Sequence, residues 1–165
     1  MPPVVSIVGK SNSGKTTLIE KLIGELNLRG YRVATIKHTA EGVSFDSPGK
    51  DSWRHIRAGS AATVFSSPDR IVMVKPVAAD APLDEVARLL GEDYDIILAE
   101  GFKKGNAPKI EVHRRGAAPP LRGIKQLIAI ATDEPLDTET RQFSLDDIAA
   151  LTDLLEKDFI KSMLR

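Results

Sequence analysis

Residues 4–16 read Val-Val-Ser-Ile-Val-Gly-Lys-Ser-Asn-Ser-Gly-Lys-Thr. From Gly9 to Thr16 the spacing is Gly, four variable residues, Gly, Lys and Thr, which is the pattern of a phosphate-binding loop. Such a loop must aim successive backbone N–H groups at an anion, and its glycines keep side chains out of the way. An apolar run precedes the loop, and apolar residues follow it at helical spacing. The stretch therefore predicts a strand, a phosphate loop and a helix.

Each part of this loop has an expected role in binding a nucleoside triphosphate. The helix contributes its N-terminal N–H groups and the positive end of its dipole, so the β-phosphate is expected there. Lys15 is expected to bridge the β- and γ-phosphates, and the Thr16 hydroxyl is expected to ligate Mg²⁺. The predicted nucleotide-binding residues of the loop are Gly9, Lys10, Ser11, Asn12, Ser13, Gly14, Lys15, Thr16 and Thr17.

Length and composition limit the possible classes of protein. A chain of 165 residues suits one domain, residues 1–165, because a chain of this size buries about 70% of its unfolded surface. The 23 basic and 23 acidic residues cancel, so the overall charge favours neither nucleic acid nor membrane as a partner. The absence of cysteine excludes disulfides and thiolate chemistry. No apolar stretch approaches the ~20 residues of a membrane span, so a cytoplasmic protein is expected.

Strand and helix signals alternate along the chain. After the first strand and helix, strands are predicted at 31–37, 63–66, 71–75, 94–99, 109–113 and 127–131, and helices at 50–58, from Pro82 to about 90, and after a capping box of Ser144 and Asp147. Residues 39–49 predict a loop. A tight turn should make 63–66 and 71–75 antiparallel. The pattern favours an α/β fold, a single P-loop NTPase-like domain with a mixed, mostly parallel sheet and helices on both faces.

An acid ends the apolar run at residues 96–99. Glu100 follows this run, where a P-loop sheet places its second magnesium-site group. A carboxylate there can hold a Mg²⁺-bound water or orient an attacking water. We therefore expect Thr16 and Glu100 to form the metal site, and Lys15 and Glu100 to be the catalytic residues of any hydrolysis. The alternative is a charged residue that simply leaves a strand.

Basic residues gather after the predicted strand 31–37. The cluster consists of Lys37, His38, Lys50, Asp51, Arg54 and Arg57. Because the carboxyl ends of parallel strands meet at the ligand crevice, this cluster could bind a second anionic group or a partner. The helical spacing of its later members is equally typical of a solvated helix face.

Asp133 follows the predicted strand 127–131. Its carboxylate could accept hydrogen bonds from N1–H and N2–H₂ of guanine, a pair of donors that adenine lacks. The alternative is a turn or capping role, because the longer Asn-Lys-x-Asp pattern is absent. Asp133 is thus a candidate nucleotide-binding residue that would favour GTP.

Several motifs, in their order and spacing, resemble those of one family. They are Gly9 to Thr16, Lys37-His38-Thr39, Phe45-Asp46, Pro48-Gly49-Lys50-Asp51-Ser52, Arg54, Ala58-Gly59 and Leu98-Ala99-Glu100-Gly101-Phe102-Lys103. Together they are similar to the molybdopterin-guanine dinucleotide biosynthesis protein B (MobB) family over residues 4 to about 133. The Pro-Gly-Lys-Asp-Ser and Glu-Gly-Phe-Lys segments are the most specific. Where the family usually carries a further histidine after Lys-His, this chain has Ala40 and Glu41.

The resemblance implies a dimeric P-loop protein that binds GTP with Mg²⁺ and hydrolyses it feebly. Its implied role is accessory, since a partner nucleotidyltransferase would attach GMP to molybdopterin. The implied partners are therefore that enzyme, a molybdopterin-type cofactor and a second copy of the chain.

Two other functions stay open at this stage. A small-molecule kinase would share the loop and use arginines on a closing lid, for which Arg114, Arg115 and Arg122 are candidates. A kinase also needs a base beside an acceptor hydroxyl, and no residue of that stretch can be identified as such a base. The other alternative is a nucleotide-gated adaptor without chemistry, in which GTP would order residues 39–49 into a docking surface.

Overall fold

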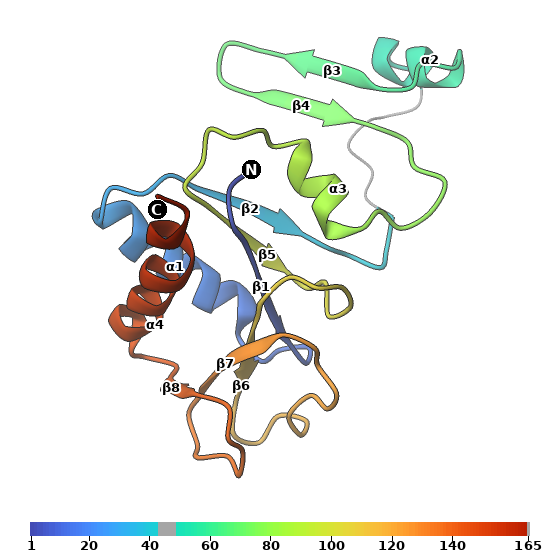
Figure 1. Ribbon diagram of the computed structural model, residues 1–165. Coiled ribbons are helices and arrows are strands. Elements are labelled where there is room, and N and C mark those ends of the chain that lie inside the picture. Colours follow the sequence, from blue (N-terminus) through green and yellow to red (C-terminus); the bar gives the residue numbers. More distant parts are fainter. Residues whose placement is uncertain (43–48, 165) are drawn as a thin grey trace. The chain divides into compact units, whose positions relative to one another are not determined.

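The computed structural model describes residues 1–42 and 49–164 (Figure 1). The chain divides into two compact units, Met1–His38 with Pro82–Arg165, and Thr39–Ala81. The single domain expected over residues 1–165 stays a prediction. Of the loop expected at 39–49, residues 43–48 lie outside the described part.

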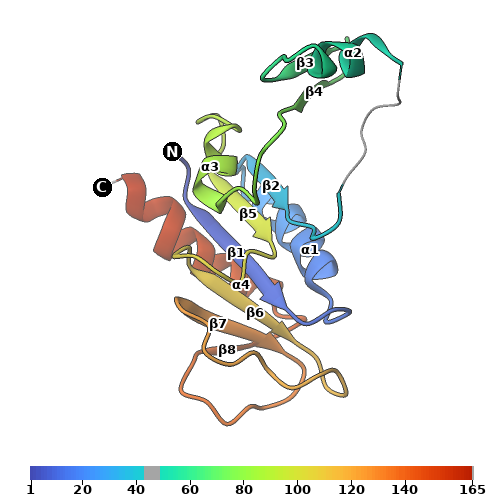
Figure 2. The ribbon, with the colours of Figure 1, turned by 90° about the vertical axis from the view of Figure 1, so that its right-hand side faces the viewer.

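A six-stranded sheet forms the first unit. Its strand order is β2-β5-β1-β6-β7-β8. The strands are β1 (Val4–Gly9), β2 (Val33–Lys37), β5 (Ile96–Glu100), β6 (Lys109–His113), β7 (Leu127–Thr132) and β8 (Gln142–Ser144). The described pairs of this sheet are all parallel, and the arrows of β1, β5 and β6 point the same way in Figure 2. The residues that follow these strands therefore gather at one edge of the sheet.

Helices cover both faces of this sheet, as the sequence predicts. On one face, α1 (Lys15–Leu28) and α4 (Ile148–Leu155) lie side by side and bury Leu22 and Leu151 (Figure 1). On the other face, α3 (Leu83–Arg88) buries Ala87 against Ile97 and its neighbours. A parallel sheet covered on both faces needs apolar residues on both sides of its strands, which explains the nearly continuous apolar sequences of β1 and β5.

The second unit contains α2 (Asp51–Arg57) and a hairpin of β3 (Thr63–Ser66) and β4 (Ile71–Val74). The antiparallel pairing predicted for this hairpin is confirmed, with Thr63 opposite Val74 and Ser66 opposite Ile71. The two strands form a sheet of their own instead of an edge of the main sheet. The mixed character predicted for the main sheet is thus located in a separate small sheet.

Two predictions about the segment before α4 are corrected. Ser144 does not cap the helix but is the last residue of β8. This strand has three residues and was not predicted from the sequence. Asp147 is the N-cap itself, because its carboxylate accepts a hydrogen bond of 3.0 Å from the Ala150 N–H. A carboxylate in this position satisfies one of the free N–H groups of the first turn.

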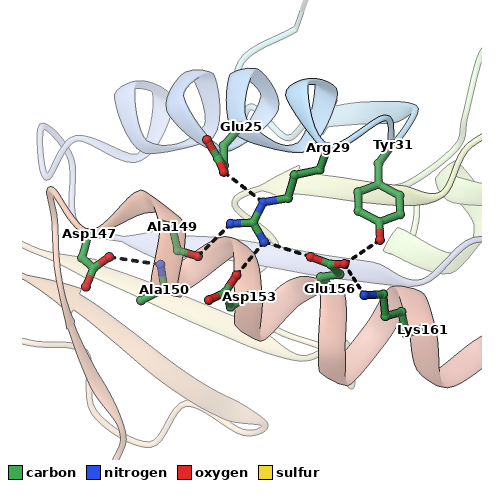
Figure 3. Close-up of polar contacts among 9 residues, drawn as sticks. All are labelled: Glu25, Arg29, Tyr31, Asp147, Ala149, Ala150, Asp153, Glu156 and Lys161. Carbon is green, nitrogen blue, oxygen red and sulfur yellow. Dashed lines mark hydrogen bonds and ion pairs between the residues drawn. The ribbon is translucent and has the colours of Figure 1, made fainter.

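A network of charged side chains joins the end of α1 to α4 (Figure 3). The Arg29 guanidinium donates to Glu25 at 2.9 Å, to Asp153 at 2.6 Å and to Glu156 at 2.9 Å. Tyr31 donates its hydroxyl to Glu156 at 2.9 Å, and Lys161 pairs with the same carboxylate. Glu156 begins a π-helical turn, Glu156–Ile160, which is followed by a 3₁₀ turn, Lys161–Leu164. The network therefore holds the C-terminal helical segment against α1.

This network predicts a dependence of stability on pH. Hydrogen bonds from Lys161, Arg29 and Tyr31 lower the pKa of Glu156 from 4.5 to about 2. A carboxylate whose pKa is lower in the folded state stabilises the fold at pH values above its pKa in the unfolded state. This stabilisation should therefore disappear as the pH falls from about 4.5 towards 2. In thermal unfolding, Glu156→Gln should have a lower Tm than the unmodified chain at pH 7, and the difference should shrink over that acidic range. Glu92→Gln, at an exposed carboxylate, is the control. A difference that stays constant with pH would contradict the assignment.

Candidate functional site

The predicted phosphate loop connects β1 to α1 at the carboxyl edge of the sheet. Gly14 is the N-cap of α1 and has a left-handed conformation, with φ of 96°. Asn12 is also left-handed, with φ of 61°, and it lies with Lys10 and Ser11 on the surface. The side chain of Ser13 is buried beneath the loop. The loop thus exposes its outer residues while Gly14 provides the turn into the helix, a conformation that glycine adopts without strain.

Lys15 reaches back across the loop. Its ammonium group donates to the Lys10 carbonyl at 2.7 Å and lies 3.4 Å from the Gly9 carbonyl. Burial lowers the pKa of Lys15, the charge of Glu100 opposes this, and the charges of Lys103 and Lys37 lower it further. Positive charges around a partly buried ammonium group favour an anion in their midst.

Thr16 and Glu100 come together, from α1 and β5. The Thr16 hydroxyl lies 3.2 and 3.1 Å from the two carboxylate oxygens of Glu100. Lys37 lies opposite Glu100 in the register of β2 and β5, and its ammonium group is 3.9 Å from the carboxylate. A hydroxyl and a carboxylate side by side are the oxygen donors that Mg²⁺ prefers, so this pair fits the predicted metal site. In the described residues no group of three or more histidine or acidic side chains forms a metal cluster.

The turn after β5 is packed against the end of β2. Gly101 has φ of 99°, and a Cβ there would lie 3.3 Å from the Cβ of His38. The His38 ring packs on Phe102, with ring centroids 4.8 Å apart. The His38 N–H donates to the Glu100 carbonyl at 3.0 Å. His38 therefore helps to fix the turn that carries Glu100.

The predicted second-anion cluster is divided between the two units. Lys37 and His38 belong to the first unit, and Lys50, Asp51, Arg54 and Arg57 belong to the second. Within the second unit, Arg54 lies 3.8 Å from Asp51 on α2, and the Arg57 guanidinium lies 5.5 Å from the centre of the Trp53 ring. The use of these residues as one site stays a prediction.

Asp133 makes a contact of the kind that the turn interpretation predicts. Its Oδ1 accepts a hydrogen bond of 2.6 Å from the Arg115 N–H, so it joins the segment after β7 to the segment after β6. The next residue, Glu134, contacts His113 Nε2 at 2.7 Å and lies 3.4 Å from Arg115 Nε. Recognition of guanine by Asp133 stays a prediction.

Sequence reasoning missed two cations at the loop, Lys103 and Arg114. The charge of Lys103 reaches Lys15, as the lowered pKa of that group indicates. A Cβ built on Gly14 would lie 3.2 Å from Nη2 of Arg114. From the sequence, Arg114 was a candidate for a kinase lid or for the pterin site, and not for the phosphate loop. Its place beside the loop follows from its position directly after β6, a neighbour of β1 in the sheet, and this strand order is not visible in the sequence.

The fold and the site define a P-loop nucleotide-binding protein. A glycine-containing loop follows the first strand, and lysine and threonine begin the next helix. No helix in residues 1–42 and 49–164 has the length and apolar character needed to cross a membrane. The chain belongs to the MobB family, because residues 4–133 match the family model described as molybdopterin guanine dinucleotide synthesis protein B. The resemblance seen in the sequence is thereby confirmed.

Similar proteins cover nearly the whole chain. It is 38% identical over 159 residues to the molybdopterin-guanine dinucleotide biosynthesis adapter protein of Haemophilus influenzae, which covers 93% of this chain and 88% of that one. It is 34% identical over 161 residues to the protein of the same name from Escherichia coli, with 94% and 92% covered. The fold is similar to the crystal structure of a molybdopterin-guanine biosynthesis protein B, with a TM-score of 0.73 and 29% identity over 94% of this chain and 99% of that chain.

Proposed function

We propose that this chain is a GTP-binding accessory protein in the formation of molybdopterin guanine dinucleotide. In this role it assists a partner nucleotidyltransferase that attaches GMP to molybdopterin. The observation that carries the proposal is the phosphate loop, with Thr16 beside Glu100, in a member of the MobB family. The names of the relatives from H. influenzae and E. coli, both adapter proteins, support the accessory role.

The nucleotide is GTP with Mg²⁺, held by the loop from Gly9 to Thr17. Thr16 and Glu100 hold the metal ion, which neutralises phosphate charge when bound. Asp133 provides the preference for guanine. In its support, Asp133 is exposed, and Oδ2 of its carboxylate accepts no hydrogen bond from the described residues.

Hydrolysis of GTP by the chain alone is slow, with Lys15 and Glu100 as its catalytic residues. Lys15 stabilises charge on the phosphates, and Glu100, at the end of β5, is the carboxylate beside Thr16. Thr16 lies against both oxygens of that carboxylate, and Lys37 faces one of them. Glu100 is therefore better placed to complete a metal site than to activate water, which favours binding over turnover.

The proposed assembly is a homodimer formed through the second unit. Exposed apolar side chains of its hairpin include Val64 at 54%, Ile71 at 72% and Met73 at 48%. Val64 lies opposite Met73 in the antiparallel register, and Ile71 is two residues from Met73, so the three share one face. An isolated two-stranded hairpin is only marginally stable in water. A second copy that covers this face would stabilise it.

The candidates for binding the anionic molybdopterin, or the partner enzyme, are the basic residues from Lys37 to Arg57. In the first unit these are Lys37 and His38, and in the second they are Lys50, Arg54 and Arg57, with Asp51 between them. Arginine and lysine side chains suit a phosphate group because they supply charged donors.

The function is tested by assaying the attachment of GMP to molybdopterin by the partner nucleotidyltransferase, with and without this chain. We expect the chain to raise the rate or yield, and calorimetry of the chain with Mg²⁺ to show tighter binding of GTP than of ATP. An unchanged attachment reaction would contradict the accessory role. A preference for ATP would remove Asp133 from its role. Transfer of phosphate from GTP to a small acceptor by the chain alone would favour the kinase alternative.

A further inference from the structure

Arg114 lies against the phosphate loop on the side away from Glu100. A Cβ at Gly14 would be 3.2 Å from Nη2 of Arg114, 3.8 Å from its Nε and 3.9 Å from its Cζ. Arg114 directly follows β6, which pairs with β1 on one side, while β5 pairs with β1 on the other. The guanidinium group and the carboxylate of Glu100 thus approach the loop from opposite neighbours of β1.

The backbone next to Arg114 is fixed at its C-terminal side. The Arg115 N–H donates to Asp133 at 2.6 Å, and the Ala117 N–H donates to the Arg114 carbonyl at 3.0 Å. Glu134 contacts His113 and Arg115, the residues on either side of Arg114. These contacts restrict the main chain of Arg114 before any ligand binds. Less conformational entropy is therefore lost when its side chain engages one.

The segment after β6 has a second anchor, at Leu121. Glu111 lies in the middle of β6 and is 1% exposed. Its Oε1 accepts a hydrogen bond of 2.7 Å from the Leu121 N–H. A buried carboxylate that accepts from a backbone N–H makes a strong, charge-assisted bond. The segment that begins at Arg114 is thus tied to β6 and to the turn after β7.

The Arg114 side chain itself has no protein partner in residues 1–42 and 49–164, since no hydrogen bond or ion pair there engages its guanidinium group. Its neighbour Arg115, in contrast, lies 3.4 Å from Glu134. Arg114 is exposed, so its donors are open to solvent. The planar guanidinium group can exchange that solvent for two oxygens of a phosphate group, which match its paired donors.

The charges around the loop favour an anion with several negative charges. Lys15 belongs to the loop, and Lys37 and Lys103 lie near enough to lower its pKa. Arg114 adds a further positive charge beside Gly14. Glu100 offsets part of this charge. A nucleoside monophosphate would leave much of the positive charge unpaired, whereas a di- or triphosphate would pair with more of it.

We propose that Arg114 is a phosphate-contacting residue of the nucleotide site, which binds the phosphate chain beside Gly14 and makes the site selective for nucleoside di- and triphosphates over monophosphates. This inference deepens the proposed function and rests on it. It gives the segment after β6 a role at the loop that is separate from the role of Asp133 at the base. Arg114 should therefore affect GTP and ATP alike, while Asp133 affects the choice between them.

The test is calorimetry of the whole chain with GTP, GDP and GMP in the presence of Mg²⁺. Arg114→Ala should weaken binding of GTP and GDP by about 10- to 100-fold, the range for loss of a hydrogen bond to a charged group. It should change the binding of GMP much less. Arg114→Lys keeps the charge but loses the planar guanidinium group. Its affinity for GTP and GDP should therefore lie between those of the unmodified chain and Arg114→Ala. Arg122→Ala, which removes the same charge from the same exposed segment, is the matched control and should bind as the unmodified chain does.

The outcomes separate the inference from the function on which it rests. If the unmodified chain has no affinity for GTP with Mg²⁺, both are overturned. If the chain binds GTP and Arg114→Ala binds it equally well, the inference alone is overturned. Equal losses in Arg114→Ala and Arg122→Ala would also overturn it, because they would indicate a general effect of charge. The Tm of each variant should stay near that of the unmodified chain, since both side chains are exposed.

Discussion

Replacing Lys15 with alanine should weaken binding of GTP with Mg²⁺ by about 100-fold or more, the effect of losing two or more hydrogen bonds from a charged donor. The ammonium group of Lys15 lies within the loop, 2.7 Å from the Lys10 carbonyl and 3.4 Å from the Gly9 carbonyl. From this position it can exchange those carbonyl groups for phosphate oxygens. Calorimetry with GTP measures the loss. The variant should also fail to assist the attachment of GMP to molybdopterin.

Lys21→Ala is the matched control for this substitution. Lys21 lies on α1, as Lys15 does, but pairs at 3.2 Å with Asp146, at an exposed position. Exposed ion pairs contribute little, about 0–1 kcal/mol, so neither nucleotide binding nor stability should change much. If Lys15→Ala kept the affinity of the unmodified chain, the loop would not be the nucleotide site. If Lys15→Ala lost nucleotide but still assisted the partner enzyme, GTP binding would be separate from the accessory role.

The fold around the loop could be predicted because local signals and burial agree there. The apolar run before Gly9 had to be a strand, and the apolar spacing after Thr16 had to be a helix, so the loop between them followed. The contact of Thr16 with Glu100 was also predictable in outline. Parallel strands bring their carboxyl ends to one edge, and Glu100 ends the strand that pairs with β1.

Other features depend on contacts that no local pattern encodes. The hairpin of β3 and β4 was predictable from its turn, but its separation from the main sheet was not, because strand pairing across long separations is set by packing. Asp147 rather than Ser144 caps α4, since both residue types are good caps and only the length of β8 decides between them. Arg114 reaches the loop through sheet order and the anchors of its segment, and neither can be read from the Arg-Arg-Gly sequence around it.

The second large effect is expected from Gly9→Ala, which should lower stability as well as nucleotide binding. Gly9 has φ of 156°, and a Cβ there would lie 2.6 Å from Ser13 Oγ and 2.6 Å from the Val112 carbonyl oxygen. The serine could move, but Val112 lies opposite Gly9 in the pairing of β1 with β6, so its carbonyl belongs to the sheet. A backbone shift is then required. Overpacking and an unfavourable φ should together cost about 2–4 kcal/mol.

Thermal unfolding should therefore show a fall in Tm of about 5–15 °C for Gly9→Ala, given the usual conversion for domains of this size. The affinity for GTP should fall too, because the shift displaces Ser13 inside the loop and the end of β6, from which Arg114 follows directly. Gly24→Ala is the matched control. Gly24 lies inside α1 with no atom within 4 Å of the added Cβ, so alanine should stabilise the helix by about 0.5–1 kcal/mol. A Tm for Gly9→Ala equal to that of the unmodified chain would contradict this prediction. It would show that the end of β1 tolerates a side chain, despite the close approach of β1 to β6 at Gly9.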